Sequence, residues 1–350
     1  MTDLIKEKFI TLGIESSCDE TSVSVIENGN KILSNTVFSQ IKTHKKYGGV
    51  VPEIASREHL QAINYVVKES LEEANKTFDD IDLIAVTKGP GLVGALLVGV
   101  SYAKGLSLAI DKPIIGVNHM EGHICANYLE FEELDPPFIS LVVSGGHTYL
   151  VEVLTHTEYV VIGQTRDDAA GESFDKVSRS LGLGYPGGPA IQKAAESGNP
   201  HAMEFPRIML EKDSYDFSFS GLKTAVLNYL NKEKMAGNEI NVNDVAASFQ
   251  QAVVDVLVEK SIRLIKEKNY DKFVLSGGVA ANKLLNEELA KKLEELDIEF
   301  YYPPLSLSTD NAAMIAAAGY YNYLEYGADD LKLNVIPNLG LEKGQNVSIT

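Results

Sequence analysis

Two stretches with the same pattern decide the fold class of this chain: Lys8–Ile26, "KFITLGIESSCDETSVSVI", and Phe138–Val153, "FISLVVSGGHTYLVEV". Each begins with an apolar, β-rich run, passes through a turn of small polar residues, and ends in alternating apolar and polar residues. This pattern predicts a strand, a turn and a second strand. Two hairpins of one kind, far apart in the chain, indicate an internal duplication.

A second pair of segments supports the duplication. Residues 81–108, "IDLIAVTKGPGLVGALLVGVSYAKGLSL", and residues 273–293, "FVLSGGVAANKLLNEELAKKL", each predict a strand that opens through glycines into a helix. Residues 56–76 and 242–268 have the i, i+3, i+4 apolar spacing of helices. We therefore predict two α/β halves that face each other, with a ligand cleft beyond the carboxyl ends of the strands.

The length of 350 residues also favours two domains. The acidic stretch "LEFEELDPPF", residues 129–138, carries two prolines and is the expected link. We predict one domain at 8–132 and the other at 136–309. The helix expected near the C-terminus, in the segment of about 310–342, could return to the first domain, although sequence alone leaves this open.

Composition limits the classes of function. The net charge is −18, whereas a chain that binds nucleic acid through its own surface usually has a basic excess. Nucleic acid would therefore need a local patch or a partner subunit, and the densest basic cluster is "KTHKKYGG", residues 42–49, which reads most simply as a solvated loop. Two cysteines, the absence of an export signal, and apolar runs shorter than roughly 18 uninterrupted residues predict a cytoplasmic protein.

Glycine loops and acidic side chains suggest a nucleotide site. "SGG" occurs at 144–146 and at 276–278, which we take to be matching places in the two halves, and each follows an expected strand. Glycine allows backbone N–H groups to approach a phosphate closely. On a helix Asp168, Glu172 and Asp175 would share one face, where they could bind ribose hydroxyls or simply favour the helix N-terminus.

Two histidines form the clearest candidate for a metal site. His119 and His123, in "HMEGH", are spaced i, i+4, so on a helix both rings reach one ion. Metallopeptidases of the H-E-x-x-H type carry glutamate at i+1, but Glu121 is at i+2 and is expected to point away. A third ligand is offered by Asp310 in "LSTDNAAMIAAAG", which could equally be a helix cap.

Together these motifs resemble a known family. "GIESSCDET", "HMEGH", "LVVSGGHT", "DDAAGESFDK", "GLGYPGGP", "SGGVAANKLL" and "STDNAAMIA" follow the order and approximate spacing of the TsaD family, over about residues 8–342. These are tRNA N6-adenosine threonylcarbamoyltransferases, formerly called O-sialoglycoprotein endopeptidases. The resemblance implies an α/β protein of the actin/Hsp70-like (ASKHA) fold, with two duplicated domains.

The resemblance also implies site residues. It assigns His119, His123 and Asp310 to one divalent metal ion, Fe2+ (iron) or alternatively Zn2+ (zinc). Positions that match the family's threonylcarbamoyl-AMP site are Val142, Val143, Ser144, Gly145, Gly146, Asp175, Gly188 and Asn282, and the adenosine is expected over Gly277 and Gly278. One departure is Gln192, where many relatives carry aspartate, so its role is open.

The chemistry implied is transfer of threonylcarbamoyl from threonylcarbamoyl-AMP to N6 of adenosine 37 in tRNAs that read codons beginning with A, which forms t6A. Asp19 and Glu20, in the first hairpin turn, could accept the proton. Expected partners are tRNA, a TsaB-like paralogous subunit and a TsaE-like ATPase, with no membrane. The alternatives are a metal-dependent glycoprotein endopeptidase, a kinase or ATPase of the same fold, and a nucleotide-gated scaffold.

Overall fold

A computed structural model describes residues 7–209 and 213–342, and these residues form two compact units. Of the described residues, unit 1 comprises 7–136, 153–159 and 306–342. Unit 2 comprises Pro137–Glu152 and Val160–Leu305. The chain therefore passes from unit 1 into unit 2 and comes back near its C-terminus.

The sheet of unit 1 has the strand order β3-β2-β1-β4-β5. β1 pairs with β2 in the antiparallel sense and with β4 in the parallel sense. Every residue of β1 is buried, since helices cover both faces of the sheet. The strands are β1 (Ile10–Glu15), β2 (Glu20–Glu27), β3 (Lys31–Ser39), β4 (Leu83–Gly89) and β5 (Ile114–Asn118).

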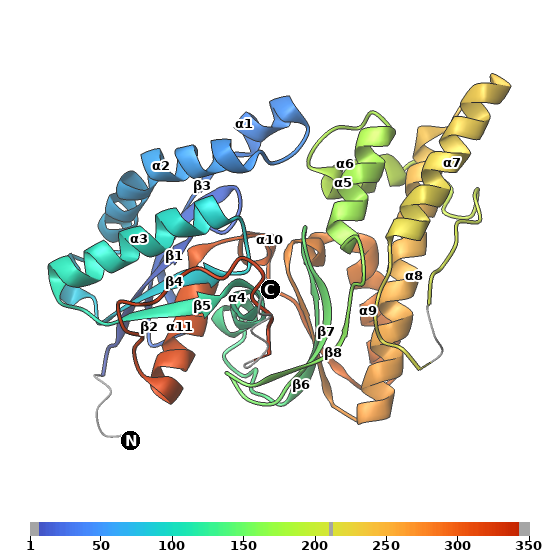
Figure 1. The fold of residues 1–350 in the computed structure, drawn as a ribbon. Helices are drawn as coiled ribbons and strands as arrows, with labels where there is room; N and C mark the ends of the chain where they lie inside the picture. The colour runs from blue at the N-terminus through green and yellow to red at the C-terminus, as the bar shows by residue number, and fades with distance from the viewer. Residues whose placement is uncertain (1–6, 210–212, 343–350) are drawn as a thin grey trace. The chain divides into compact units, whose positions relative to one another are not determined.

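Helices α2 and α3 pack on one face of this sheet and α11 packs on the other (Figure 1). The side chains of β1 alternate accordingly: Leu12 and Ile14 join the core under α2 and α3, whereas Gly13 lies against α11. The helices are α1 (Ile41–His44), α2 (Pro52–Glu73), α3 (Val93–Ile110), α4 (His119–Cys125) and α11 (Ala312–Tyr326), with 3₁₀ turns at Lys45–Tyr47, Phe78–Asp80 and Ala126–Leu129.

Unit 2 repeats the topology of unit 1. Its sheet has the order β10-β9-β6-β7-β8. As in unit 1, three consecutive strands lie side by side and two later strands extend the sheet next to the first of them, with β9 parallel to β6. The predicted duplication is confirmed. The strands are β6 (Phe138–Val143), β7 (Thr148–Val153), β8 (Tyr159–Gln164), β9 (Lys272–Ser276) and β10 (Glu299–Tyr301).

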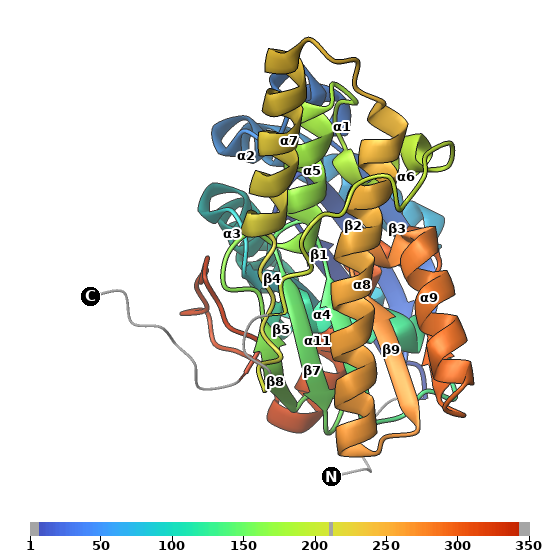
Figure 2. The same ribbon diagram turned by 90° about the vertical axis from the view of Figure 1, so that its right-hand side faces the viewer.

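The core of unit 2 is built around its longest helix, α8, which runs across the unit beside β9 (Figure 2). Its buried side chains, Phe249, Val253 and Leu257 among them, pack with those of β6 and β9. The helices are α5 (Ala170–Ser180), α6 (Gly187–Ala195), α7 (Ser220–Ala236), α8 (Val242–Lys268), α9 (Lys283–Glu294) and α10 (Leu305–Ser308), with a 3₁₀ turn at Gly278–Ala281.

Helix α3 alone, among the described residues, has the length and composition of a membrane span, with a mean hydropathy of 1.6. One face of it is buried against α2 and β4 through residues such as Ala95, Leu96 and Val100. An apolar helix that packs one face into a sheet is ordinary for an α/β core. Its opposite face stays exposed at Val93, Leu97 and Leu108.

The close approach of α11 to the sheet predicts the cost of adding a side chain there. A Cβ atom at Gly319 would lie 2.4 Å from the Cβ of Ala85, which belongs to β4. Gly319→Val should therefore lower the free energy of unfolding by about 1–3 kcal/mol or more, as overpacked cores do. Chemical denaturation of the metal-free chain measures this.

The matched control is Gly105→Ala on α3, where an added Cβ meets no atom within 4 Å. Alanine has a higher helix propensity than glycine, so this variant should be unchanged or stabilised by up to about 1 kcal/mol. Equal stability of Gly319→Val and wild type would contradict the packing described for α11.

Candidate metal centre and substrate loops

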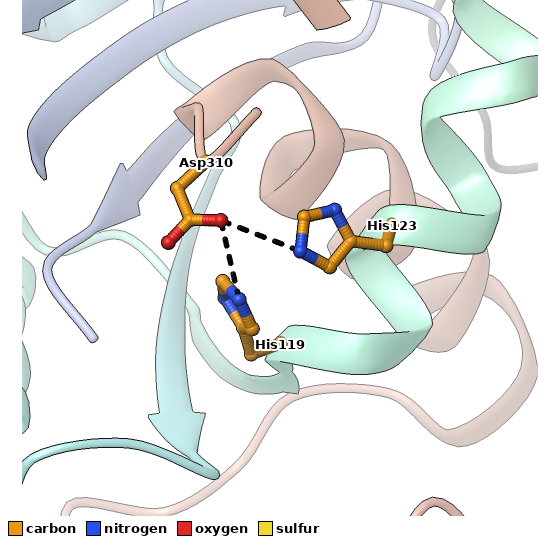
Figure 3. Close-up of side chains that lie close together, drawn as sticks. All are labelled: His119, His123 and Asp310. Atoms are coloured by element: carbon orange, nitrogen blue, oxygen red, sulfur yellow. Dashed lines mark ion pairs between the residues drawn. The ribbon is translucent and has the colours of Figure 1, made fainter. Parts of the chain in front are cut away.

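The two histidines of "HMEGH" lie on one short helix, as their spacing predicts. β5 ends at Asn118, whose side chain accepts a hydrogen bond from Met120 N at 2.9 Å and so caps α4. His119 is the first residue of α4 and His123 lies one turn later, so both rings project on the same side (Figure 3). Both side chains are buried.

The third group comes from a distant part of the sequence. Asp310 Oδ1 lies 3.5 Å from His119 Nε2 and 3.3 Å from His123 Nε2 (Figure 3). The cap of α11 is the neighbouring Asn311, whose side chain accepts a hydrogen bond from Met314 N at 3.2 Å. Asp310 is therefore not the capping residue, and its carboxylate faces the two imidazoles.

These three side chains fit a metal ion. One ligand atom from each lies within 4.8 Å of the others. Nε2 of His123 is buried and makes no hydrogen bond with any described residue, although it points at Asp310. A buried polar atom without a partner is costly. Two imidazoles and one carboxylate are ligands that iron or zinc accepts, so the group could bind a metal.

Glu15 supports the first histidine, and sequence reasoning missed it. Its Oε2 lies 2.9 Å from His119 Nδ1 and accepts a hydrogen bond from Thr87 Oγ1 at 2.6 Å, while Ser17 N donates to its other oxygen. A carboxylate on Nδ1 fixes the proton there and leaves Nε2 to a metal. The available signal was an acidic residue at the end of an otherwise apolar strand.

Charges in this group stabilise one another. Burial would lower the pKa of His119, but Glu15 and Asp310 outweigh it and hold that pKa well above its ordinary value. Burial lowers the pKa of His123, which favours the neutral imidazole that a metal requires. Burial would raise the pKa of Asp310, but the two histidines hold it far below its ordinary value, so this carboxylate stays ionised.

Glu121, the glutamate between the histidines, belongs to a different contact. Its Oε1 accepts hydrogen bonds from Asn322 Nδ2 at 2.6 Å and from Tyr159 OH at 3.4 Å. Next to it, a Cβ at Gly122 would lie 2.8 Å from Ile315 of α11. Glu121 and Gly122 thus hold α4 close to α11, and the predicted orientation of Glu121 away from the ligand atoms agrees with these contacts.

Asp19 and Glu20, the predicted proton acceptors, lie at the start of β2 in different surroundings. Asp19 is buried, and its Oδ2 makes no hydrogen bond with the described residues. Glu20 accepts a hydrogen bond from Ser39 Oγ at 3.1 Å. Burial, with the charges of Asp19 and Asp310, raises the pKa of Glu20 to about 9, so this carboxyl group is protonated at neutral pH.

The two "SGG" tripeptides both lie in unit 2. The predicted domain at 136–309 already contains both of them, and the prediction that they occupy matching places in the two halves is wrong. Val142 of β6 pairs with Ser276 of the parallel strand β9. The tripeptides at 144–146 and 276–278 therefore leave the carboxyl ends of two adjacent strands. This places four glycines at one edge of one sheet, which is the position where α/β sheets bind ligands.

Several glycines in the "SGG" loops and at the start of α6 border open space. An added Cβ at Gly145, Gly146, Gly188 or Gly278 would meet no atom within 4 Å. Gly277 differs, because its φ is +87° and a Cβ would lie 2.5 Å from the carbonyl oxygen of Val143. Val142 and Val143 themselves are buried in β6, so only their backbone could reach a ligand. Ser144 Oγ accepts a hydrogen bond from His147 N at 3.1 Å and closes the turn.

The other predicted substrate residues link the helices around these loops. Asp175 Oδ1 accepts a hydrogen bond from Gly187 N at 2.6 Å, which ties α5 to the start of α6. Asn282 caps α9 by accepting from Leu285 N at 3.0 Å, and its Nδ2 donates to Gln250 Oε1 at 2.9 Å.

Gln192, the residue that departs from the family pattern, also caps the N-terminus of α9. Its Oε1 accepts a hydrogen bond from Lys283 N at 2.9 Å. The N-terminus of α9 thus has two side-chain caps, Asn282 and Gln192, and a neutral amide satisfies the backbone donor here without a charge.

The predicted acidic face at 168–175 is only partly present. α5 begins at Ala170, so Asp168 precedes the helix and is not on its surface. Lys176 Nζ and Lys223 Nζ lie 2.9 and 2.5 Å from its carboxylate oxygens. Burial would raise the pKa of Asp168, but the two lysines hold it below its ordinary value. Glu172 also pairs with Lys176, at 2.8 Å, so both acids are neutralised.

Known proteins share this sequence along most of its length. A family profile described as "TsaD: tRNA N6-adenosine threonylcarbamoyltransferase" matches residues 31–317. A tRNA N6-adenosine threonylcarbamoyltransferase from Clostridioides difficile (strain 630) is 58% identical over 334 residues, which are 95% of this chain and 99% of the relative. The chain belongs to this family. A threonylcarbamoyltransferase from Clostridium perfringens (strain 13 / Type A) is 56% identical over 335 residues, 96% of this chain and 99% of the relative.

Solved structures with the same fold have more distant sequences. Full-length HypF, in a phosphate- and nucleotide-bound form, aligns with a TM-score of 0.61 at 18% identity over 92% of this chain and 47% of its own. This threonylcarbamoyltransferase family member therefore spans about half of HypF. Component A of Acidaminococcus fermentans (R)-2-hydroxyglutaryl-CoA dehydratase aligns with a TM-score of 0.52 at 16% identity, over 91% and 98% of the two chains. The predicted actin/Hsp70-like (ASKHA) fold is confirmed.

The contact between Glu15 and His119 predicts how the metal affinity changes. Glu15→Gln removes the charge that orients His119 Nδ1, so the affinity for Zn2+ or Fe2+ should fall about 10- to 100-fold, as it does when an outer-shell carboxylate is lost. Competition against a chromophoric chelator measures this. Glu53→Gln, at an exposed position of α2, is the control and should bind metal like wild type. Unchanged affinity in folded Glu15→Gln would contradict this role.

Proposed function

We propose that the chain transfers the threonylcarbamoyl group from threonylcarbamoyl-AMP to N6 of adenosine 37 of tRNAs that read codons beginning with A, which forms t6A. Family membership over 95% of the chain carries this proposal. The grouping of His119, His123 and Asp310 supports it, since a metal-binding group in a nucleotide-binding fold suits the handling of an acyl adenylate.

In this reaction N6 of adenosine attacks the carbamoyl carbon. The new N–C bond replaces the bond from that carbon to the phosphate oxygen, AMP leaves with the bonding electrons, and N6 loses a proton. The aromatic amine is a weak nucleophile, so positioning and polarisation of the carbonyl must supply most of the acceleration.

We propose Fe2+ as the resident ion of the His119, His123 and Asp310 group, with Zn2+ as the alternative. Two histidines and one carboxylate leave open positions for a ligand in both cases. A bound ion would supply Lewis acidity and a fixed point for the threonylcarbamoyl oxygens. The protein contributes preorganised ligand atoms, with both imidazoles buried and His119 oriented by Glu15.

Unit 2 offers the groups for the adenylate. The open backbone at Gly145, Gly146, Gly188 and Gly278 supports binding of phosphate and adenosine, because no side chain blocks the approach of a ligand. The proposed contacts remain Val142, Val143, Ser144, Gly145, Gly146, Asp175, Gly188, Gly277, Gly278 and Asn282. Because Asp175 and Asn282 each already hold one backbone N–H group, they would position loops as well as contact a ligand.

Asp19 and Glu20 remain the proposed proton acceptors, and their surroundings favour Asp19. The raised pKa of Glu20, about 9, keeps a proton on it at neutral pH, whereas Asp19 has a buried oxygen without a hydrogen bond among the described residues. A carboxyl group that already holds a proton cannot accept another, so Glu20 is the less favoured of the two.

We also propose that 8–132, with the returning segment of about 310–342, acts as one domain and 136–309 as the other, in a cytoplasmic protein. The two units of the fold support these boundaries, with the difference that Val153–Tyr159 groups with unit 1. A tRNA substrate, a TsaB-like subunit and a TsaE-like ATPase are the proposed partners. An exposed apolar face on α3 supports a subunit interface, because Val93, Leu97 and Leu108 are 53%, 44% and 67% exposed.

A glycoprotein endopeptidase is the less favoured candidate. Its H-E-x-x-H chemistry needs a glutamate base beside the metal, but the Glu121 carboxylate bonds to Asn322 and Tyr159. A sugar kinase or ATPase of this fold is disfavoured because the curated relatives share 56–58% identity over nearly the whole chain.

The transfer reaction predicts loss of activity when one metal ligand is removed. The purified chain, its partner subunits, tRNA and threonylcarbamoyl-AMP should yield t6A, which nucleoside mass spectrometry detects. His123→Ala should lower the rate more than about 100-fold, because loss of a metal ligand costs more than loss of a residue that only hydrogen-bonds to a ligand. His201→Ala, at an exposed position, is the control and should retain the wild-type rate. Absence of t6A with the wild-type chain would refute the proposed function.

The exposed face of α3 predicts that a charge there disrupts subunit assembly. Leu97→Glu should weaken binding of the TsaB-like subunit about tenfold or more, because a buried unpaired carboxylate is costly in an interface. Analytical ultracentrifugation or calorimetry measures this. Met235→Glu on α7, where the methionine is 89% exposed, should bind the subunit like wild type. Equal binding by both variants would place the interface elsewhere.

A further inference from the structure

A short basic loop separates β3 from α2, and we name residues 41–48 the lysine loop. It consists of α1, the 3₁₀ turn Lys45–Tyr47 and Gly48, and it stands at the end of α2 in unit 1 (Figure 1). Its three lysines, Lys42, Lys45 and Lys46, are exposed, and the loop contains no acidic residue. In a chain of net charge −18, such a segment is a local exception.

A buried histidine fixes the lysine loop. His44 is fully buried and its Nδ1 accepts a hydrogen bond from Val51 N at 3.3 Å. Its Nε2 therefore carries the proton and donates to Gln40 Oε1 at 3.0 Å. Gln40 precedes the loop and Val51 caps α2, so the histidine joins the two ends of the loop. A loop closed in this way presents its lysines in a defined arrangement.

Within the described part of the chain, the three lysines have no acidic partner. Some exposed lysines elsewhere in this acidic chain do pair with acids, as Lys31 does with Glu27 at 3.0 Å and Lys283 with Glu287 at 3.7 Å. Among the described residues, no side chain forms an ion pair or hydrogen bond with the ammonium groups of the lysine loop. Their charge is thus available to an external anion.

An exposed aromatic ring accompanies the charges. Tyr47 is 60% exposed and follows the lysines directly, just before Gly48, whose φ is +72°. Lysines next to an exposed aromatic ring match single-stranded nucleic acid, in which phosphates bind cations and unpaired bases stack on rings. An acidic protein surface could pair with the lysines, but it would offer no unpaired base to stack on Tyr47.

The lysine loop is joined to the strand that carries the proposed proton acceptors. Gln40 N donates a hydrogen bond to Asp19 O at 3.0 Å, and Ser39 pairs with Glu20 in the β2–β3 ladder. Ser39 Oγ also donates a hydrogen bond to Glu20 Oε1 at 3.1 Å, so the segment that leads into the loop contacts both Asp19 and Glu20. A polyanion bound at the loop is therefore tethered beside the reactive groups of unit 1.

We propose that the lysine loop binds phosphates of the tRNA substrate next to its unpaired, reactive region, with Lys42, Lys45 and Lys46 as phosphate contacts and Tyr47 as a stacking surface. This inference rests on the proposed function, which makes tRNA the substrate. It explains how a chain of net charge −18 can contribute directly to binding a polyanion.

The test replaces the three lysines together, as Lys42→Gln, Lys45→Gln and Lys46→Gln, in the full chain assembled with its partner subunits. The dissociation constant for tRNA should rise at least about tenfold at low salt, because three phosphate contacts are lost. A plot of log Kd against log salt concentration should lose a slope of about 2 to 3. The KM for tRNA should rise, while kcat at saturating tRNA stays at the wild-type value.

The matched control removes the same charge from unit 2, as Lys232→Gln, Lys234→Gln and Lys291→Gln, at three exposed positions. It should bind tRNA with the wild-type constant and salt slope. An equal weakening by the control would show a general charge effect and overturn the proposal. Unchanged tRNA binding by the loop variant would also overturn the proposal. A loss confined to subunit assembly would overturn it too, and would instead make an acidic partner protein the ligand of the loop.

These outcomes are separable from failure of the proposed function. If the wild-type assembly forms no t6A, the function itself is refuted whatever the lysines do. If the wild-type assembly forms t6A and the loop variant matches it in Kd, salt slope and KM, only the assignment of the lysine loop fails. Metal affinity should be equal in wild type, loop variant and control, which verifies that unit 1 is folded in each.

Discussion

The return of α11 to the sheet of unit 1 is the contact on which the candidate metal centre depends. The helix packs on β1, β4 and β5 where glycines such as Gly319 permit close approach, and Asp310 lies just before its first turn. The hydrogen bond from Asn322 to Glu121 then fixes α11 to the helix that bears the histidines. A residue from the end of the chain is thus placed beside His119 and His123 by packing rather than by sequence proximity.

Electrostatics and packing reinforce each other at this site. Two buried imidazoles and the buried carboxylate of Glu15 would each be costly alone. Placed together, Glu15 and Asp310 favour the charged form of His119, while His119 and His123 favour the ionised form of Asp310. A divalent cation would extend the same compensation, because it supplies positive charge to a group that has two carboxylates.

The sequence predicted most of the architecture because strand and helix periodicity repeat in both halves. The helix at 242–268 was placed to the residue. Short or half-exposed strands such as β3 and β8 carry weaker periodicity and were missed. The assignment of one "SGG" to each half was wrong and conflicted with the predicted domain at 136–309. The parallel pairing of β6 and β9 shows that both tripeptides follow adjacent strands of one sheet.

Prediction of the site had a similar limit. The i, i+4 spacing gave His119 and His123, but the choice between ligand and cap for Asp310 needed the hydrogen bond of Asn311. Glu15 could not be assigned from the sequence, because its role depends on a ring more than a hundred positions away. Local patterns therefore supply candidate residues, and long-range packing selects among them.

The most direct test of this account is anomalous X-ray diffraction at the iron and zinc edges, on crystals of the chain purified from cells without added metal. We predict one strong anomalous peak bound by Nε2 of His119, Nε2 of His123 and a carboxylate oxygen of Asp310. A peak that lies elsewhere, or a peak that lacks Asp310 as a ligand, would contradict the central claim that α11 completes a metal centre.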